Sequence, residues 1–385
     1  MRIFISTGEV SGDLQGSLLI KALQSQGRER GEDLEIVALG GDRMAEAGAT
    51  LIANTAHIGS VGLLEALPFL WENGKVQREA KQYLQENPPD IVILIDYQDP
   101  NLAIGSFLRT KFPDVPIIFF IAPQAWVWYP LSSKIETLVR ITDRILAIFP
   151  AEKKFYEQRG VSTDWVGHPL IDRIQTAPTR EKARFRLGIP PEQTAIALVP
   201  ASRQQEIQAL LTPIFTAARQ LQEKIPTAHF WIPLSLERYR RAIEEKIKEY
   251  QLQATILTGK TLEILAAADL AITKSGTVNL EIALFNVPQV VVYRVHPLNM
   301  WIARKIFNFS IPFMSPVNLM NMEAIVPEFF QEEVTAENIF TEAFDLLENQ
   351  QRLKSILSGY QRMRSSMGKF GVCDRAAREI LKFMD

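Results

Sequence analysis

The sequence predicts an α/β fold made of two doubly wound domains, each containing a parallel sheet. Short aliphatic or β-branched runs alternate with helical stretches, a spacing typical of βαβ units. The pattern restarts after a polar, proline-containing stretch at residues 172–180. A length of 385 residues also favours about two domains. The expected strands are 3–5, 36–39, 91–95, 117–121 and 145–148 in the first domain, and 195–199, 230–232, 255–257, 270–272 and 290–292 in the second.

The domain boundaries follow from this pattern. We expect a first domain at 1–172, a second at 173–350, and terminal helices at 351–385 that pack back on the first domain. Open parallel sheets carry ligand-binding loops at the carboxyl ends of their strands. Two sheets that face each other therefore predict an active-site cleft between the domains.

Composition narrows the function classes. The formal net charge is -2 and the pI is near 6.2, so the chain has no overall attraction for nucleic acid. The single cysteine, Cys373, allows no internal disulfide and fits a reducing compartment. Glu9 and Asp13 interrupt the N-terminal apolar run before it reaches signal-peptide length. We therefore expect a cytoplasmic protein without nucleic acid as a partner.

One uncharged run, residues 115–133, approaches the length of a membrane-spanning helix. Pro116, Pro123 and Pro130 divide it, and each would remove a helical hydrogen bond. We expect a buried strand that leads into an aromatic loop.

A glycine-containing loop follows the first expected strand. Residues 8–16 read Gly-Glu-Val-Ser-Gly-Asp-Leu-Gln-Gly and open a helix. Glycines permit a tight turn, and free amides at a helix start attract anions. The alternative is an ordinary loop in which Ser11 or Asp13 caps the helix.

Two carboxylates, Asp96 and Asp99, follow the strongly apolar strand at 91–95. Glycosyl transfer with inversion needs a base to take the proton of the acceptor hydroxyl, and either aspartate fits that role. The alternative is that Asp99 caps the next helix and Asp96 fixes a loop.

Two further segments of the first domain carry candidate substrate contacts. Residues 122–128 include Gln124 and Trp126, and their tryptophans fit either an apolar wall for a sugar or acyl chain or simple packing. His168 fits a residue that contacts substrate phosphate or accepts a proton. A structural histidine at a hinge is the alternative. The remaining histidines are dispersed, so we expect no metal site.

The second domain carries two loops suited to a nucleotide. Ser202 and Arg203 follow its first strand, where an arginine can neutralise a departing diphosphate; an exposed capping loop is the alternative. The turn Ser275–Gly276–Thr277 opens a helix whose amides suit a pyrophosphate. Glu281 lies about one helical turn beyond Thr277, within reach of ribose hydroxyls. Ser275 or Thr277 as a simple cap is the alternative.

These segments, in this order, resemble the lipid A disaccharide synthase family across essentially the whole chain. The resemblance rests on Gly-Glu-Val-Ser-Gly-Asp, Pro-Gln-Ala-Trp-Val-Trp, Gly-His-Pro, Ser-Arg-Gln-Gln-Glu and Ser-Gly-Thr with its following Glu. It implies a GT-B type fold of two Rossmann-like domains and an inverting transfer that needs no cofactor. The implied substrates are UDP-2,3-diacylglucosamine and 2,3-diacylglucosamine 1-phosphate, joined by a β-1,6 bond with release of UDP.

The resemblance also carries residue roles. Those implied to bind the nucleotide are Ser202, Arg203, Ser275, Gly276, Thr277, Glu281, Asn318 and Gln331, and those implied to bind substrate are Gly8, Glu9, Ser11, Gly12, Asp13, Gln124, Trp126 and His168. Asp96 and Asp99 match the acidic segment of the family. Gln98 and Pro100 stand where relatives usually have proline and phenylalanine, and Ala201 stands where they usually have glycine.

Acylated substrates imply a peripheral position on the inner membrane, with apolar residues around 63–71 and 301–307 in contact with lipid. A buried packing helix is the alternative for the second segment. A homodimer is a further expectation from the resemblance. Two other functions remain open: a lipid-binding homologue without catalysis, and another nucleotide-sugar enzyme of the same architecture, such as an epimerase.

Overall fold

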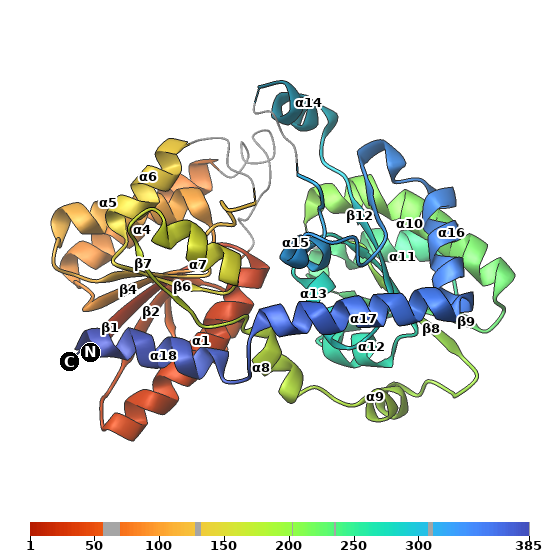
Figure 1. Ribbon diagram of the computed structural model, residues 1–385, viewed down its shortest axis with the longest axis horizontal. Coiled ribbons are helices and arrows are strands. Elements are labelled where there is room, and N and C mark those ends of the chain that lie inside the picture. The colour runs from red at the N-terminus through yellow and green to blue at the C-terminus, as the bar shows by residue number, and fades with distance from the viewer. Residues whose placement is uncertain (57–69, 128–131, 202, 235, 307–310, 385) are drawn as a thin grey trace. The chain divides into compact units, whose positions relative to one another are not determined.

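A computed structural model describes residues 1–56, 70–127, 132–201, 203–234, 236–306 and 311–384. Within these residues the chain forms two compact units (Figure 1). The first combines residues 1–173 with 366–384, and the second combines residues 174–306 with 311–365. Each unit contains one parallel sheet with helices on both faces.

The first sheet has seven strands in the order β3-β2-β1-β4-β5-β6-β7. The strands are β1 (Arg2–Ser6), β2 (Glu35–Gly40), β3 (Thr50–Asn54), β4 (Ile91–Leu94), β5 (Ile117–Phe120), β6 (Arg144–Ala147) and β7 (Ser162–Trp165). Every residue of β4 and β5 is buried, as expected for strands covered on both faces. Strands β2 and β3 are added on one side of β1, and strands β4 to β7 are added on its other side. The switch point, where such folds bind ligands, therefore lies between β1 and β4.

The helices of the first unit cover this sheet. They are α1 (Val10–Arg30), α2 (Asp42–Glu46), α4 (Leu70–Glu86), α5 (Gln98–Lys111), α6 (Ser132–Ile141), α7 (Pro150–Glu157) and α18 (Val372–Leu381). Phe4, Phe119 and Tyr156 are fully buried in the core cluster of this unit. The C-terminal helix α18 packs along α1, where Gln26 Nε2 donates to the carbonyl of Asp374.

The second sheet has six strands in the order β10-β9-β8-β11-β12-β13. The strands are β8 (Thr194–Val199), β9 (Ala228–Leu234), β10 (Ala254–Thr258), β11 (Leu270–Lys274), β12 (Gln289–Tyr293) and β13 (Glu328–Phe330). Its switch point lies between β8 and β11. The two sheets therefore repeat one arrangement, and the loops after these two strands are where the second unit is expected to bind a ligand.

Helices of the second unit lie on both faces of its sheet (Figure 1). The helices of this unit are α9 (Arg180–Leu187), α10 (Gln204–Lys224), α11 (Arg240–Glu249), α12 (Thr261–Ala267), α13 (Val278–Leu284), α14 (Pro297–Ile306), α15 (Pro316–Asn321), α16 (Ala336–Glu348) and α17 (Gln350–Met367). Helix α14 stands apart from the sheet. Helix α8 (Leu170–Gln175) contains the point where the chain passes from the first unit to the second.

The structure differs from the sequence expectation in three strands and one boundary. Strands β3, β7 and β13 were not expected, since β7 reads Ser-Thr-Asp-Trp and β13 has three residues. The return to the first unit was expected at residue 351, but it occurs near 366. Helix α17 instead packs within the second unit, where the Tyr360 hydroxyl donates to the carbonyl of Val287 at 2.9 Å.

The uncharged run at 115–133 contains β5 and the start of α6. Among the helices that the structure describes, none is both long enough and apolar enough to cross a bilayer.

Candidate functional site

The loops after β1 and β4 meet at the switch point of the first sheet. A Cβ atom at Gly8 would lie 2.0 Å from the ring of Tyr97, so only glycine fits there. Burial raises the pKa of Tyr97 to about 12, and its hydroxyl donates to Asn73 Oδ1 at 2.7 Å. Asp96 and Tyr97 have φ of 46° and 45°, a left-handed conformation that non-glycine residues rarely adopt. Two such residues in succession mark this loop as a candidate site.

The side chain of Asn101 holds the loop after β4 in place. Its side chain is fully buried, and its Nδ2 donates to the carbonyls of Asp96 at 2.7 Å, Ile95 at 3.1 Å and Ser6 at 3.3 Å. Its Oδ1 accepts a hydrogen bond from Ser6 Oγ at 2.7 Å. One amide group thus ties the ends of β1 and β4 together. No role for Asn101 was predicted from the sequence.

The two candidate bases lie in different surroundings. The Asp99 carboxylate is 67% exposed, in the first turn of α5, and Lys134 of α6 lies 2.6 Å from its Oδ1. Asp96 is half-buried, one residue beyond the end of the buried strand run. Tyr97 is the N-cap of α5, and no side chain caps that helix. The alternative interpretation of Asp99 as a helix cap is therefore wrong.

A buried carboxylate, Glu152, supports the same edge of the sheet and was not predicted. Its oxygens accept hydrogen bonds from the amides of Ala122 at 3.2 Å, Ile148 at 2.8 Å and Phe149 at 3.3 Å, which belong to the loops after β5 and β6. Burial raises the pKa of Glu152 to about 8. The only sequence signal was a glutamate in the first turn after Pro150.

Ile121 adds backbone strain next to this carboxylate. Its φ of 65° is unusual for a β-branched residue, and its carbonyl accepts from the amide of Asp96 at 2.9 Å. Ala201, by contrast, is not among the described residues with positive φ, so alanine at this position brings no left-handed strain.

The N-terminal loop holds a second structural carboxylate. Asp13 is buried, and its carboxylate accepts from the amides of Gly41 at 2.8 Å, Met44 at 3.0 Å and Arg43 at 3.3 Å. Asp13 therefore caps the start of α2 rather than its own helix, although burial still raises its pKa. A Cβ at Gly12 would lie 1.8 Å from Thr7 Oγ1, so Gly12 allows close packing of α1. These contacts favour a structural role for both residues.

Gly8, Glu9 and Ser11 occupy the start of the same loop and helix. Glu9 and Ser11 are half-buried. Their contact with substrate stays a prediction.

The aromatic loop and His168 are linked by ring contacts. Trp126 Nε1 donates to Oε1 of the exposed Gln124 at 2.6 Å, and its ring meets Phe149 edge-on, with centroids 6.0 Å apart. Phe149 in turn lies 5.5 Å from the ring of His168.

His168 is buried, and burial lowers its pKa to about 3. Its Nδ1 accepts from the amide of Leu170 at 3.2 Å. This favours the structural interpretation of His168 over a proton acceptor. Trp128 lies outside the described residues.

The second unit brings two cations to one carboxylate at its switch point. Arg203 follows β8, and its Nη1 lies 3.5 Å from Oε1 of Glu206. Lys274 ends the neighbouring strand β11, and its Nζ lies 3.6 Å from the same oxygen. The amide of Arg203 also donates to Glu206 Oε2 at 3.0 Å. No role for Lys274 or Glu206 was predicted from the sequence, and Ser202 lies outside the described residues.

The turn Ser275–Gly276–Thr277 lies directly after Lys274. Ser275 Oγ donates to the carbonyl of Met314 at 2.6 Å, and Thr277 makes no capping hydrogen bond, so neither caps α13. Asn279 shapes the turn instead, because its Oδ1 accepts from the amide of Gly276 at 2.9 Å. Glu281 is buried, with 6% exposure. Its predicted contact with ribose stays a prediction.

Asn318 and Gln331 hold backbone. Asn318 is fully buried; its Oδ1 accepts from the amides of Ile325 and Val326, and its Nδ2 donates to the carbonyl of Val326 at 2.9 Å. Gln331 has φ of 53°, and its side-chain amide pairs with both the amide and the carbonyl of Val295. Both side chains are engaged with the protein itself, which favours a structural role over the nucleotide contact implied by the resemblance.

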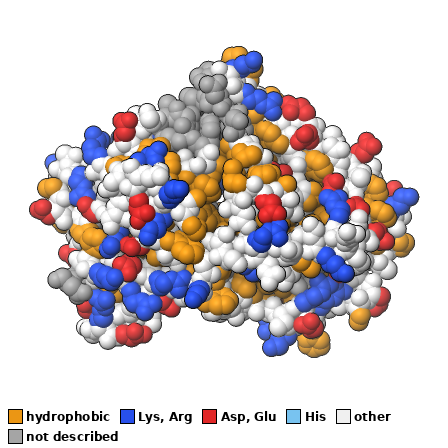
Figure 2. Space-filling model, viewed as in Figure 1, with side chains coloured by type: hydrophobic (Ala, Val, Ile, Leu, Met, Phe, Trp, Pro, Cys, Tyr) orange, Lys and Arg blue, Asp and Glu red, His pale blue; other side chains and the backbone are white. Residues whose placement is uncertain are grey.

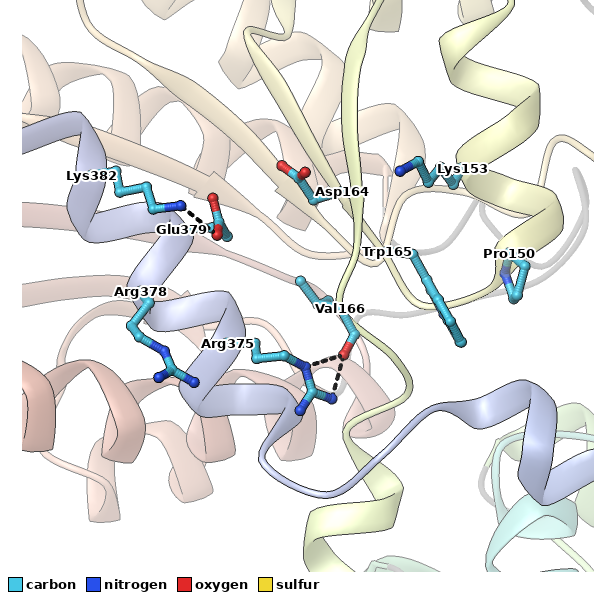
Figure 3. A pocket seen from close by; sticks show the side chains of 9 residues that line it. All are labelled: Pro150, Lys153, Asp164, Trp165, Val166, Arg375, Arg378, Glu379 and Lys382. Atoms are coloured by element: carbon cyan, nitrogen blue, oxygen red, sulfur yellow. Dashed lines mark hydrogen bonds and ion pairs between the residues drawn. The ribbon is translucent and has the colours of Figure 1, made fainter.

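A separate cavity of about 500 Å³ lies on the first unit between α18 and the end of β7 (Figure 3). Lys and Arg side chains gather on this part of the unit (Figure 2). Arg375 is committed to the protein, since its Nη2 donates to the carbonyl of Val166 at 2.8 Å, and Lys382 pairs with Glu379 at 2.7 Å. The cavity includes none of the predicted site residues.

Comparison with known proteins identifies the family. The family model described as lipid-A-disaccharide synthetase matches residues 3–383. The lipid-A-disaccharide synthase of Gloeothece citriformis is 60% identical over 384 residues, covering 100% of both chains. The lipid-A-disaccharide synthase of a Synechocystis species is 53% identical, covering 100% of this chain and 98% of the relative. The chain belongs to the lipid-A-disaccharide synthase family. It is thus a glycosyltransferase of lipid A biosynthesis with lipid-A-disaccharide synthase activity.

Solved structures agree on the fold. The structure of S. aureus MnaA with UDP has a TM-score of 0.69 at 15% identity and covers 100% of this chain and 96% of that chain. A UDP-GlcNAc 2-epimerase of Methanocaldococcus jannaschii has a TM-score of 0.63 at 15% identity, covering 99% and 100%. At this identity the likeness shows a GT-B-like fold alone. Since fold does not fix the reaction, the family match separates this lipid-A-disaccharide synthase homologue from the epimerases.

Proposed function

We propose that the chain transfers a diacylglucosaminyl unit from UDP-2,3-diacylglucosamine to the 6-hydroxyl of 2,3-diacylglucosamine 1-phosphate. One observation carries this proposal: the two switch points bear opposite charge. The first presents Asp96 and Asp99, and the second presents Arg203 and Lys274 around one glutamate. An acidic group suits deprotonation of an acceptor, and cations suit a leaving diphosphate.

We assign the base to Asp99 rather than Asp96. The acceptor hydroxyl has to reach its base from outside the protein, so that base has to be accessible, and the Asp99 carboxylate is 67% exposed. Lys134 restrains that carboxylate at 2.6 Å. Asp96 has a left-handed backbone, and Asn101 and Ile121 hold its carbonyl and amide. We therefore assign Asp96 a positioning role for the loop that carries Asp99.

The proposed reaction is a direct displacement at the anomeric carbon of the donor. Asp99 takes the proton of the acceptor 6-hydroxyl while that oxygen attacks the anomeric carbon of the donor. The bond between this carbon and the diphosphate breaks, and UDP leaves with the electron pair from the opposite face. The configuration at the anomeric carbon inverts and a β-1,6 bond forms. Arg203 stabilises the negative charge that develops on UDP.

The test measures UDP release and product mass with both acylated substrates. It compares the parent with Asp99→Asn, Asp96→Asn and Arg203→Ala. Asp114→Asn is the matched control, because Asp114 is exposed and precedes the amino end of β5, whereas Asp99 lies beyond the carboxyl end of β4.

We expect a disaccharide 1-phosphate from the parent and the control. Loss of one oriented acid–base group typically costs about 10²–10⁴-fold in rate, so Asp99→Asn should show the largest fall in kcat. A larger loss in Asp96→Asn would reassign the base. An epimerised nucleotide sugar without disaccharide, or lipid binding without UDP release, would refute the proposed reaction and support one of the two other functions.

We also propose peripheral association with the inner membrane through α14. Trp301 and Leu298 on this helix are 56% and 45% exposed, and Arg304 and Lys305 follow in its last turn. Exposed apolar side chains beside cations are typical of helices that lie at an anionic lipid surface. Trp71 on α4 is 76% exposed and is a second candidate contact, whereas residues 63–69 and Phe307 lie outside the described residues. The homodimer stays a prediction that size-exclusion chromatography can check.

A further inference from the structure

We propose that Lys274 is a second diphosphate-binding cation of the nucleotide site, and that Glu206 positions both Lys274 and Arg203. The inference rests on the proposed function and names a ligand contact that the sequence analysis did not assign. The ligand class is a nucleoside diphosphate.

The position of Lys274 is the first argument. Lys274 is the last residue of β11, which pairs with β8, the strand that leads to Arg203. Both cations therefore leave the sheet at its switch point, where doubly wound sheets bind phosphates. Glu206 Oε1 lies 3.6 Å from Lys274 Nζ and 3.5 Å from Arg203 Nη1.

The charge of the cluster is the second argument. The side chains of Lys274 and Glu206 are 10% and 7% exposed, and that of Arg203 is 23% exposed. Lysine is rarely buried to this degree without a specific partner, because removing its charge from water is costly. Both cations therefore lie in one cluster at the switch point, where an ammonium and a guanidinium group suit an anionic diphosphate.

Gly276 supplies an independent argument. A Cβ atom at Gly276 would lie 2.6 Å from Lys274 Nζ, and the φ of Gly276 is 155°. The absence of a side chain thus allows the ammonium group to lie against the Ser275–Gly276–Thr277 turn. This is the turn that the sequence predicts to hold the diphosphate, so a ligand there would meet Lys274 directly.

A purely structural role for Lys274 makes a different prediction. If Lys274 only neutralises the buried Glu206, the double variant should bind UDP as tightly as Glu206→Gln alone. If Lys274 contacts the diphosphate, the double variant should bind UDP more weakly than Glu206→Gln. A contact between Lys274 and the diphosphate involves the β-phosphate, which UMP lacks. Loss of the Lys274 charge should therefore weaken the binding of UMP less than the binding of UDP.

The experiment measures the Kd of UDP and of UMP by calorimetry, together with kcat, for the full chain. The variants are Lys274→Met, Lys274→Arg, Glu206→Gln and the double variant Lys274→Met/Glu206→Gln. Lys246→Met is the matched control, since Lys246 forms a carboxylate pair with Glu249 on α11, away from the switch point. The double variant leaves no unpaired buried carboxylate, so it keeps the test valid if the single variant folds poorly.

We expect Lys274→Met to weaken UDP binding by about 10-fold or more, the usual loss for a charged hydrogen bond, with a smaller effect on UMP. The double variant should remain equally weak, and Lys274→Arg should retain part of the affinity. Parental UDP affinity in Lys274→Met, or equal UDP affinity of the double variant and Glu206→Gln, would overturn the inference while leaving the proposed function intact. A parent that binds neither nucleotide, or that releases no UDP in turnover, would overturn both.

Discussion

Ser6 Oγ donates a 2.7 Å hydrogen bond to Oδ1 of Asn101, and this contact joins the last residue of β1 to helix α5 at the switch point of the first sheet. The same side chain donates from Nδ2 to carbonyls of both strand ends. Geometry at the candidate base therefore depends on one fully buried amide. Such a group is costly to replace, because its partners would be left without hydrogen bonds.

The first prediction concerns this amide. Asn101→Ala should lower the free energy of unfolding by about 3 kcal/mol, because several buried groups lose their partner. Asn101→Asp should be at least as damaging, since its carboxylate would face three carbonyl oxygens. Thermal unfolding followed by circular dichroism checks both, with the exposed Asn54→Ala as control. A stable, active Asn101→Asp variant would contradict the proposed role.

The second prediction concerns metal ions. UDP release should be unchanged by excess EDTA, because Arg203 and Lys274 supply the positive charge that a divalent cation provides in other transferases. Among the described residues, no group of three or more His, Cys, Asp or Glu is arranged to hold a metal ion. The measurement is the initial rate with and without chelator. Loss of activity on chelation that added Mg²⁺ reverses would contradict this account.

The third prediction concerns His168, whose pKa is lowered by burial to about 3 from an ordinary value of 6.5. Between these values the unfolded chain binds a proton that the folded chain does not. The neutral His168 therefore contributes to the stability of the folded state fully above pH 6.5, and this contribution is lost as the pH falls from 6.5 toward 3. On going to pH 5, the parent should lose about 2 kcal/mol more than His168→Asn, which does not titrate but keeps an acceptor for Leu170.

The activity of the same variant separates the two interpretations of His168. A neutral, structural His168 predicts that the parent and His168→Asn share one pH profile of kcat/KM between pH 6 and 9. If a limb near pH 6.5 is present in the parent and missing in the variant, His168 titrates during turnover, and the structural interpretation is wrong.

The sequence predicted the sheets better than the roles of polar residues within the site. Apolar runs such as 91–94 and 117–120 are buried on both faces and leave a clear hydrophobic signal. Asp13, Asn318 and Gln331 have the residue types of ligand contacts, but in the structure their side chains bind backbone groups between 7 and 36 positions away. No local pattern distinguishes these two uses of a polar side chain.

The contacts that define the site are similarly long-range. Lys274 and Glu206 are 68 positions apart, and they meet only because β11 lies beside β8. Glu152 supports loops after two different strands, one of them 30 positions away. The order of strands in the sheet, which spacing along the chain does not reveal, creates both sites.

The last prediction concerns the membrane. Trp301→Glu should reduce sedimentation with vesicles of phosphatidylethanolamine and phosphatidylglycerol by about 10-fold or more, because burying an apolar side chain of this size contributes about 1.5–3 kcal/mol. Phe185→Glu is the matched control, since Phe185 is 87% exposed in the same unit but lies on α9. The double variant Arg304→Gln/Lys305→Gln should weaken binding to the anionic vesicles, because it removes two positive charges that attract anionic lipid. Its binding to neutral phosphatidylcholine vesicles should be unchanged. Equal losses in the Trp301 and Phe185 variants would show that exposed aromatic residues act without regard to position, and α14 would then not be the docking helix.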